Sequence, residues 1–276
     1  MRNDPGLQAA NYTLRDEIRD YWSARAATFD QSPGHEIFSE EERKAWHGLI
    51  EKHLGPGEER AALDLASGTG VISHLMDDLG YRVTGIDWSE NMLDLARSKA
   101  KTRGRSIRFQ LGDAERTLAP DDSFDVIVTR HLVWTLVDPQ ACFKEWYRIL
   151  KPGGRLLVID GDFVNTGFLE RVVKRVDALL QKAGWLSPQP VHAPAGLADT
   201  HRSILSRVHF SNGARAEAVG RLLADSGFSV LSTDHDLRRI HRAQAAYLGR
   251  FKALARGLQH RYAIVAEKPV TASRPL

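Results

Sequence analysis

Glycines and carboxylates stand at the ends of two apolar segments, with a spacing that suits nucleotide binding. Residues 61–70 read Ala-Ala-Leu-Asp-Leu-Ala-Ser-Gly-Thr-Gly, an apolar strand that runs into a glycine turn. A second predicted strand ends at Asp87, about 17 residues after the turn. Glycine lets the backbone approach a ligand, and a carboxylate at the tip of the next strand can accept hydrogen bonds from two ribose hydroxyls. The pattern predicts half of a nucleotide-type site.

Asp64 distinguishes between the nucleotide cofactors. It stands at the strand end before the turn, where a dinucleotide would place its pyrophosphate, and two negative groups would repel each other there. A cofactor that carries an ammonium and a sulfonium, and no phosphate, is instead attracted by this carboxylate. S-adenosylmethionine fits that description.

Residues 64–70 resemble the first motif of the class I S-adenosylmethionine-dependent methyltransferases, which reads acid-x-Gly-x-Gly-x-Gly. Ala66 replaces the first glycine, which puts in doubt any contact that requires a positive φ at this position. Further stretches match the family in its order: 81–87 with its terminal acid, Gly112-Asp113-Ala114, and the turn and strand of 151–159. The resemblance covers residues 61–160.

The resemblance implies that Asp87 binds the ribose and that residues after it surround the adenine, with S-adenosylhomocysteine as the product. An indole such as Trp88 offers a flat face to the adenine ring. The expected cofactor contacts are Asp64, Ala66, Gly68, Gly70, Asp87, Trp88, Met92, Asp113, Ala114, Tyr21 and Thr129. Simpler roles stay open, since Asp64, Asp87 and Asp113 are also suited to caps and turns, and Trp88 to the core.

Beyond the fourth predicted strand, polar and aromatic side chains are suited to an acceptor site. His131 lies where open α/β folds bind ligands, and its imidazole is the candidate general base for a hydroxyl or amine acceptor. The alternative is a histidine that only bonds to backbone or to the cofactor carboxylate. The expected substrate contacts are Trp22, Arg130 and Trp134.

Alternating apolar strands and helices predict one doubly wound α/β domain over residues 1–276, with a seven-strand, mostly parallel sheet. The strands are expected near 61–66, 81–86, 106–111, 124–129, 155–160, 228–233 and 262–267. We expect a helical lid at 12–54, a cofactor-binding core at 61–160, a substrate cap at 161–213 with a helix near 168–183, and the last helix and two strands at 214–270. A basic helical insertion separates those last two strands.

Composition agrees with a single core and excludes several classes. The chain has 276 residues, 42% of them hydrophobic, and one cysteine, Cys142, for which we expect a buried thiol. No apolar run is long enough for a membrane helix, and the N-terminus lacks a secretory segment, so we expect a cytoplasmic protein without a membrane partner. Monomer and homodimer both stay open.

The charge distribution does not predict nucleic-acid binding, because the formal net charge is only +3. The last third has a basic stretch, which we interpret as the solvated face of one amphipathic helix: Arg238, Arg239, His241, Arg242, Arg250, Lys252 and Arg256. The motifs typical of base-amino and cytosine C5 methyltransferases are missing after the fourth strand. We therefore expect a small-molecule substrate.

A metal is not expected. Asp160, Asp162 and Asn165 resemble the ligands of catechol-type methyltransferases, but Thr129 and Arg130 occupy the place of that family's further acid. The histidines of the second insertion lack metal-type spacing: His192, His201 and His209. The sequence thus predicts methyl transfer to oxygen or nitrogen of a small metabolite. The alternatives are a non-catalytic cofactor-binding or regulatory protein and, with Ser73 in place of a third glycine, an NAD-type oxidoreductase.

Overall fold

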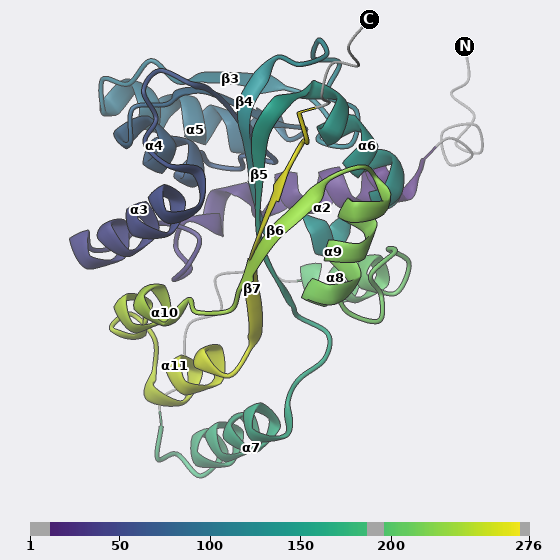
Figure 1. Ribbon diagram of the computed structural model, residues 1–276. Helices are drawn as coiled ribbons and strands as arrows, with labels where there is room; N and C mark the ends of the chain where they lie inside the picture. Colours follow the sequence, from purple (N-terminus) through teal and green to yellow (C-terminus); the bar gives the residue numbers. More distant parts are fainter. Residues whose placement is uncertain (1–11, 187–195, 271–276) are drawn as a thin grey trace, which may run out of the picture.

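Seven strands form one sheet in the order β3-β2-β1-β4-β5-β7-β6 in the computed structural model, which describes residues 12–186 and 196–270 (Figure 1). The strands are β1 Ala61–Leu65, β2 Arg82–Asp87, β3 Arg108–Leu111, β4 Phe124–Arg130, β5 Leu150–Asp162, β6 Ser229–Asp234 and β7 His260–Glu267. β1 to β5 pair in parallel, whereas β7 runs antiparallel between β5 and β6. The predicted doubly wound, mostly parallel sheet is confirmed.

Helices cover both faces of the sheet because its strands are apolar on both sides. On β5, Leu156 and Val158 face one cluster with α6 Pro139–Ile149 and α9 Ala216–Asp225. The alternate residues Leu157 and Ile159 face the other cluster, with α3 Glu40–Leu54, α4 Val71–Asp78 and α10 Arg238–Ala245. Side chains that alternate along a strand give a parallel sheet two buried faces. Figure 1 shows these helices as two layers.

The strand bounds differ from the predicted ones mainly at β5, which begins at Leu150 rather than near residue 155. α6 ends at Ile149, so the glycine turn of 151–154 is included in β5. The pairing of β4 with β5 has a register irregularity nearby, between Phe124 and Val126. Cys142 is buried and free, as predicted.

The predicted lid region 12–54 divides into two parts with different positions. α2, Leu14–Phe29, crosses the carboxyl ends of the strands and is joined to α5, Glu90–Thr102, where Ser23 Oγ bonds to Ser89 Oγ at 2.8 Å. α3 instead packs with α4 and α10 on one face of the sheet. Only α2 and the segment that follows it to His35 border the cavity described below.

The described parts of the region 161–213, residues 161–186 and 196–213, contain two helices, α7 Phe168–Lys182 and α8 Leu197–Leu205, of which only the first was predicted. α8 packs against α2 through a small apolar cluster that includes Ile18, Tyr21 and Ile204. α7 lies apart from α2, at the lower end of Figure 1 beside α11, and leaves several apolar side chains exposed. Within the described ranges, no helix is long and apolar enough to cross a membrane.

The basic insertion differs from its prediction, because it forms two helices instead of one. α10 is followed by a break and then by α11, Arg250–Gly257, whose N-cap is Gly249. Ile240 and Ala255 are buried, whereas Tyr247 and Leu254 of the predicted apolar face are 45% and 53% exposed. The break turns α11 towards the cavity, where Arg256 lines the wall.

Candidate active site

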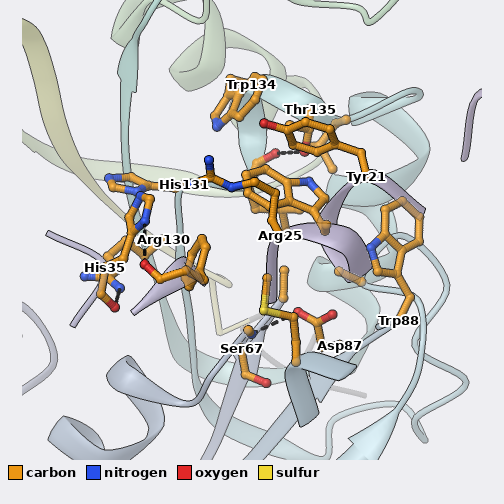
Figure 2. A pocket seen from close by; sticks show the side chains of 18 of the residues that line it. Tyr21, Arg25, His35, Ser67, Asp87, Trp88, Arg130, His131, Trp134 and Thr135 are labelled. Carbon is orange, nitrogen blue, oxygen red and sulfur yellow. Dashed lines mark hydrogen bonds between the residues drawn. The ribbon is translucent and has the colours of Figure 1, made fainter. Parts of the chain in front are cut away.

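One cavity of about 760 Å³ lies at the carboxyl ends of the strands, under α2 and α8 (Figure 2). Open α/β sheets bind ligands at this edge. Most of the predicted site residues line it: Tyr21, Trp22, Asp64, Ala66, Gly68, Asp87, Trp88, Met92, Asp113, Ala114, Arg130, His131 and Trp134. These residues come from segments far apart in the sequence, which the sheet brings to one place.

The turn after β1 takes a left-handed backbone at several positions. Gly68 has φ 54° and Gly70 has φ 83°, and a Cβ on Gly70 would lie 2.9 Å from Cζ of Phe109. Ala66 stands where the family has glycine, yet it also adopts a positive φ, of 53°. The positive φ that the alanine put in doubt is therefore present, at a cost of about 1–2 kcal/mol for a residue with a Cβ.

Asp87 joins the turn after β1 to the end of β2 at the cavity wall. Its Oδ2 accepts a hydrogen bond from Gly68 N at 2.9 Å, and its Oδ1 accepts one from Ser89 N at 2.9 Å. Burial raises the pKa of this carboxyl to about 6, although the backbone donors oppose the shift. The carboxylate is thus held at the cavity wall by the glycine turn, as a ribose acceptor requires. Figure 2 shows it beside Ser67 and Trp88.

Asp64 is buried at the end of β1 and accepts a hydrogen bond from Ser73 Oγ at 2.6 Å. Burial raises its pKa to about 7. The carboxyl borders the cavity, so a ligand with a positive charge would favour its ionised form. Ser73 stands where dinucleotide-binding turns have a third glycine, and its hydrogen bond to Asp64 gives the serine a structural role at this position.

Asp113 lines the adenine side with both oxygens already engaged. Oδ1 accepts a hydrogen bond from Glu115 N at 2.8 Å, and Oδ2 pairs with Arg15 of α2 at 2.9 Å. Arg15 also bonds to Glu115, which ties the start of the lid to this loop. Trp88, half-buried, and Met92 border the same side of the cavity.

Thr129 and Gly70 are not among the residues that border the cavity. Thr129 is fully buried, and its hydroxyl donates to the carbonyl of Leu65 at 3.0 Å across β4 and β1. Its predicted cofactor contact is corrected to a bond within the sheet. Gly70 acts instead as the N-cap of α4, where the contact with Phe109 leaves no room for a side chain.

His131 follows β4 with a left-handed φ of 60° and lies beside Arg261 of β7. Its Nε2 is 3.2 Å from Nη1 of Arg261, and because a guanidinium only donates, Nε2 accepts and the proton lies on Nδ1. Burial and the neighbouring cations Arg261 and Arg130 hold the pKa of this imidazole well below its usual value. Its role as a base stays a prediction that this contact does not favour.

Among the cavity residues that the sequence did not identify as site residues, five are basic. They are Arg25 of α2, His35 of the following segment, His201 of α8, Arg256 of α11 and Arg261 of β7. Arg25 lies four residues after Tyr21 on the same helix, a helical spacing that offers a signal for it. The other positions follow from long-range packing of insertions and have no local signal.

Aromatic side chains form the wall between these cations. The Trp22 and Trp134 rings lie 6.2 Å apart at 72°, and Trp134 lies 6.0 Å from Phe163 and 5.5 Å from His201. Buried donors without a partner among the described residues also border the cavity: Arg25 Nε, Ser67 Oγ, Trp134 Nε1 and Arg256 Nε. Unpaired buried donors are costly, which indicates a polar ligand.

Asp160 and Asp162, which resemble metal ligands in the sequence, are both hydrogen-bonded to backbone N–H groups. Asp160 accepts bonds from Val133 N and Gly161 N, and Asp162 accepts bonds from Val164 N and Asn165 N. No group of metal-ligating side chains occurs in the part of the chain that the structure describes. His209 does not border the cavity, and His192 lies outside the described residues.

Three features define a Rossmann-like methyltransferase fold: the strand order, the antiparallel last strand, and the carboxylate of β2 that faces a glycine turn. This fold has its ligand site at the carboxyl edge of the sheet. A family model described as a methyltransferase domain matches residues 63–158. This match coincides with the strands and turns that carry Asp64, Asp87 and Asp113.

Relatives agree with that class. The chain is 33% identical over 159 residues to the ubiquinone/menaquinone biosynthesis C-methyltransferase UbiE of Bdellovibrio bacteriovorus, covering 56% of this chain and 67% of that protein. It is 38% identical over 100 residues to a demethylmenaquinone methyltransferase of Thermus thermophilus, covering 36% of this chain and 46% of that protein. The chain thus spans from about half to two thirds of the length of these relatives.

A solved structure has the same fold over most of the chain. Phosphoethanolamine N-methyltransferase 2 of Haemonchus contortus, in complex with S-adenosyl-L-methionine, has a TM-score of 0.60 with 15% identity, over 95% of this chain and 59% of that one. At this identity the likeness concerns the fold alone. With the relatives above, the chain belongs to the class I S-adenosylmethionine-dependent methyltransferases, and its cofactor is S-adenosylmethionine. This sets aside the NAD-type alternative.

Proposed function

We propose that this protein transfers the methyl group of S-adenosylmethionine to an oxygen or nitrogen of a small molecule enclosed in the cavity. The observation that carries the proposal is one continuous cavity of about 760 Å³, which joins the ribose acceptor Asp87 to the aromatic wall around Trp134. Its volume lies in the range in which proteins enclose small ligands. α2 and α8 cover it, so a polymer would have to displace both helices.

The cofactor fits the lower part of the cavity in Figure 2. Asp87 accepts hydrogen bonds from the ribose hydroxyls, and Trp88 and Met92 pack on the adenine. Asp64 attracts the cationic part of the methionine chain. Arg25, whose Nε has no partner among the described residues, binds the methionine carboxylate. This arrangement directs the sulfonium methyl towards Trp22 and Trp134.

The transfer itself is an in-line displacement. A lone pair of the acceptor forms the new bond to the methyl carbon while the bond from carbon to sulfur breaks and its electrons stay on sulfur. The acceptor then, or beforehand, loses its proton. Positioning of the two reactants supplies most of what such a reaction needs from a protein. The sulfonium loses its charge, so a nearly dry aromatic wall favours the transition state over the charged reactant.

Neutral imidazoles at the acceptor end can take up that proton. His35 has its pKa lowered to about 3 by burial, and its Nδ1 lies 3.2 Å from the carbonyl of Phe29, which leaves Nε2 as an acceptor. Burial also lowers the pKa of His201, which lies on α8 against Tyr21. Both side chains border the cavity, whereas Nε2 of His131 is occupied by Arg261.

A carbon acceptor is the second candidate, because the relative from Bdellovibrio bacteriovorus is named as a C-methyltransferase of ubiquinone/menaquinone biosynthesis. The aromatic wall would also hold a planar ring. Carbon acceptors need an activated ring carbon, whereas oxygen and nitrogen acceptors use an existing lone pair.

Both candidates are tested with S-adenosylmethionine labelled with ¹³C at the methyl group and a panel of small hydroxy and amino aromatic compounds. The ¹³C shift of the product distinguishes O-methyl, N-methyl and C-methyl groups. We expect the label on oxygen or nitrogen, and its loss in Asp87→Ala. Label on ring carbon would favour the second candidate. Tight binding of S-adenosylhomocysteine without any transfer to the panel would favour the non-catalytic alternative.

A further inference from the structure

Three arginines border the acceptor end of the cavity without an acidic partner. Arg130 ends β4, Arg256 lies on α11 and Arg261 lies on β7. Within the described residues, none of the three has a carboxylate oxygen within 4.0 Å. Other arginines of the same ranges, such as Arg43 and Arg148, do form ion pairs. The cavity thus brings together three arginines that are not in ion-pair contact with a carboxylate of the described residues.

Neutral groups occupy part of each guanidinium. Arg130 donates to the carbonyl of Gly34 at 3.2 Å, and Arg256 donates to the carbonyl of Pro33 at 2.9 Å. Arg261 donates to Gln259 Oε1 at 3.0 Å and to His131. Each guanidinium has five N–H donors, so each retains donors for a ligand. Carbonyls satisfy hydrogen bonds but do not neutralise charge. The carboxyl groups that act on these arginines, among them Asp64, Asp160 and Glu42, lie beyond 4.0 Å, so they offset the positive charge only in part.

The three cations are close enough to disfavour one another. Burial and the charge of Arg130 together lower the pKa of Arg256 to about 10, although Glu42 acts in the opposite direction. Burial likewise lowers the pKa of Arg261 to about 9, with Arg256 acting in the same direction. Like charges held together in a partly buried site are unfavourable until a counter-ion arrives. An anion bound here would remove that repulsion.

The cofactor does not supply this counter-ion. S-adenosylmethionine carries one carboxylate against two positive groups, and Arg25 on α2 is placed for that carboxylate. Asp87 is engaged by the turn and the ribose, and Asp64 by Ser73 and the methionine chain. The excess positive charge of the acceptor end therefore remains when the cofactor is bound. The positive charge of the sulfonium adds to this excess.

We propose that the methyl acceptor is an anion, whose carboxylate or phosphate group binds to Arg256 and Arg261. The inference rests on the proposed function and defines its substrate class. Arg261 packs over Phe163 of the aromatic wall, with its Cζ 5.2 Å from the ring centroid, and Arg256 borders the same cavity from α11. An acceptor anchored there would cross the aromatic wall and present its other end to the sulfonium.

The basic insertion between β6 and β7 thereby receives a role. Arg256 belongs to α11 of this insertion and turns inward, whereas Arg250 at the start of the same helix is exposed. Arg250 and Arg256 thus lie on the same helix but in different surroundings. This makes Arg250→Gln a matched control for Arg256→Gln.

The test uses protein saturated with S-adenosylhomocysteine and three probes of similar size: benzoate, phenyl phosphate and neutral benzamide. Titration calorimetry measures each probe against wild type, Arg256→Gln, Arg261→Gln, Arg256→Lys and Arg250→Gln. We expect at least one anion to bind about tenfold more tightly than benzamide, as a charge-assisted contact requires. We expect the two glutamine variants at 256 and 261 to lose about tenfold or more, Arg256→Lys to lose less, and Arg250→Gln to match wild type.

The preference between benzoate and phenyl phosphate distinguishes a carboxylate from a phosphate. The proposal is overturned if benzamide binds as tightly as both anions, if neither anion binds up to its solubility limit, or if the variants bind the anions as wild type does. S-adenosylhomocysteine affinity is measured for every variant, and an unchanged value shows that the fold is intact. If wild type itself does not bind S-adenosylhomocysteine, the proposed function fails instead.

Discussion

The two ends of the cavity are built in different ways. The adenosine end consists of backbone N–H groups and the carboxylates of β1 and β2, all within residues 64–115. The acceptor end consists of side chains from α2, the segment to His35, β4, the loop after β5, α8, α11 and β7. One end depends on local backbone geometry, and the other on how distant segments pack.

This difference separates what the class shares from what belongs to this chain. A left-handed turn and a carboxylate at a strand tip can be kept while every acceptor contact changes, because the insertions after β5 and β6 are separate segments. Substitutions at one end should therefore leave ligand binding at the other end intact. The following predictions test that independence.

Asp87→Ala should have the largest effect on the adenosine end. It removes the acceptor of two ribose hydroxyls and of the Gly68 and Ser89 N–H groups, so S-adenosylhomocysteine binding should weaken by about 2–3 kcal/mol, or thirtyfold or more. Calorimetry measures the change, with Asp94→Ala on the exposed face of α5 as control. An unchanged dissociation constant would refute the ribose assignment.

Arg25→Gln tests the boundary between the two ends. Loss of a charge-assisted bond to the methionine carboxylate should weaken S-adenosylhomocysteine by about 1.5 kcal/mol, or tenfold. 5′-Methylthioadenosine lacks the amino-acid portion and should bind wild type and variant equally. A loss of the same size for both ligands would show that Arg25 acts on the fold of α2 instead.

The two ends should also respond to pH in different windows. The pKa of Asp87 is raised to about 6 and that of Asp64 to about 7, so acidification protonates both carboxyl groups. The affinity for S-adenosylhomocysteine should therefore fall below about pH 7, by up to about tenfold per pH unit for each carboxyl group. The cations at the acceptor end, with pKa values of about 9 and 10, should bind benzoate equally between pH 6 and 8. Affinity for S-adenosylhomocysteine that is constant down to pH 5 would contradict this assignment.

Ala66→Gly should have the smallest effect, and in the stabilising direction. Ala66 has φ 53°, a conformation that glycine adopts without steric cost, so the free energy of unfolding should rise by about 1 kcal/mol. Urea denaturation measures it. Gly48→Ala is the converse comparison: Gly48 lies in α3 with open space around its Cα, and its replacement should also stabilise, by about 0.5–1 kcal/mol.

The adenosine end could be predicted from the sequence because its requirements are local. A strand, a glycine turn and a following acid occupy adjacent residues, and the strand order is a consequence of the alternating pattern. Asp64 and Asp87 therefore border the cavity as expected. The prediction for Thr129 was wrong because side chains alternate between the two faces of β4. A difference of one residue at the end of the strand decides which side chain faces the cavity.

The acceptor end was predicted only in part, for a physical reason. Arg130 and Trp134 lie at and just after the end of β4, so their positions follow from the strand, and Trp22 lies on the helix of the predicted lid. Arg256 reaches the cavity because the basic insertion breaks between α10 and α11, whereas Arg261 reaches it from β7. The charge pattern of the insertion is equally typical of a solvated helix. Burial of a charge by distant segments leaves no periodic signal.

The distribution of tryptophans has a practical consequence for light-based measurements. Three of the six indoles border the cavity, with Trp88 beside the adenosine end and Trp22 and Trp134 at the acceptor end. Trp46 lies under the guanidinium of Arg130, Trp146 is shielded in the core, and only Trp185 is mostly in water. Intrinsic emission should therefore change when either ligand enters. The emission wavelength and intensity of the unlabelled protein, compared with those of Trp88→Phe and Trp134→Phe, would report ligand binding at each end separately.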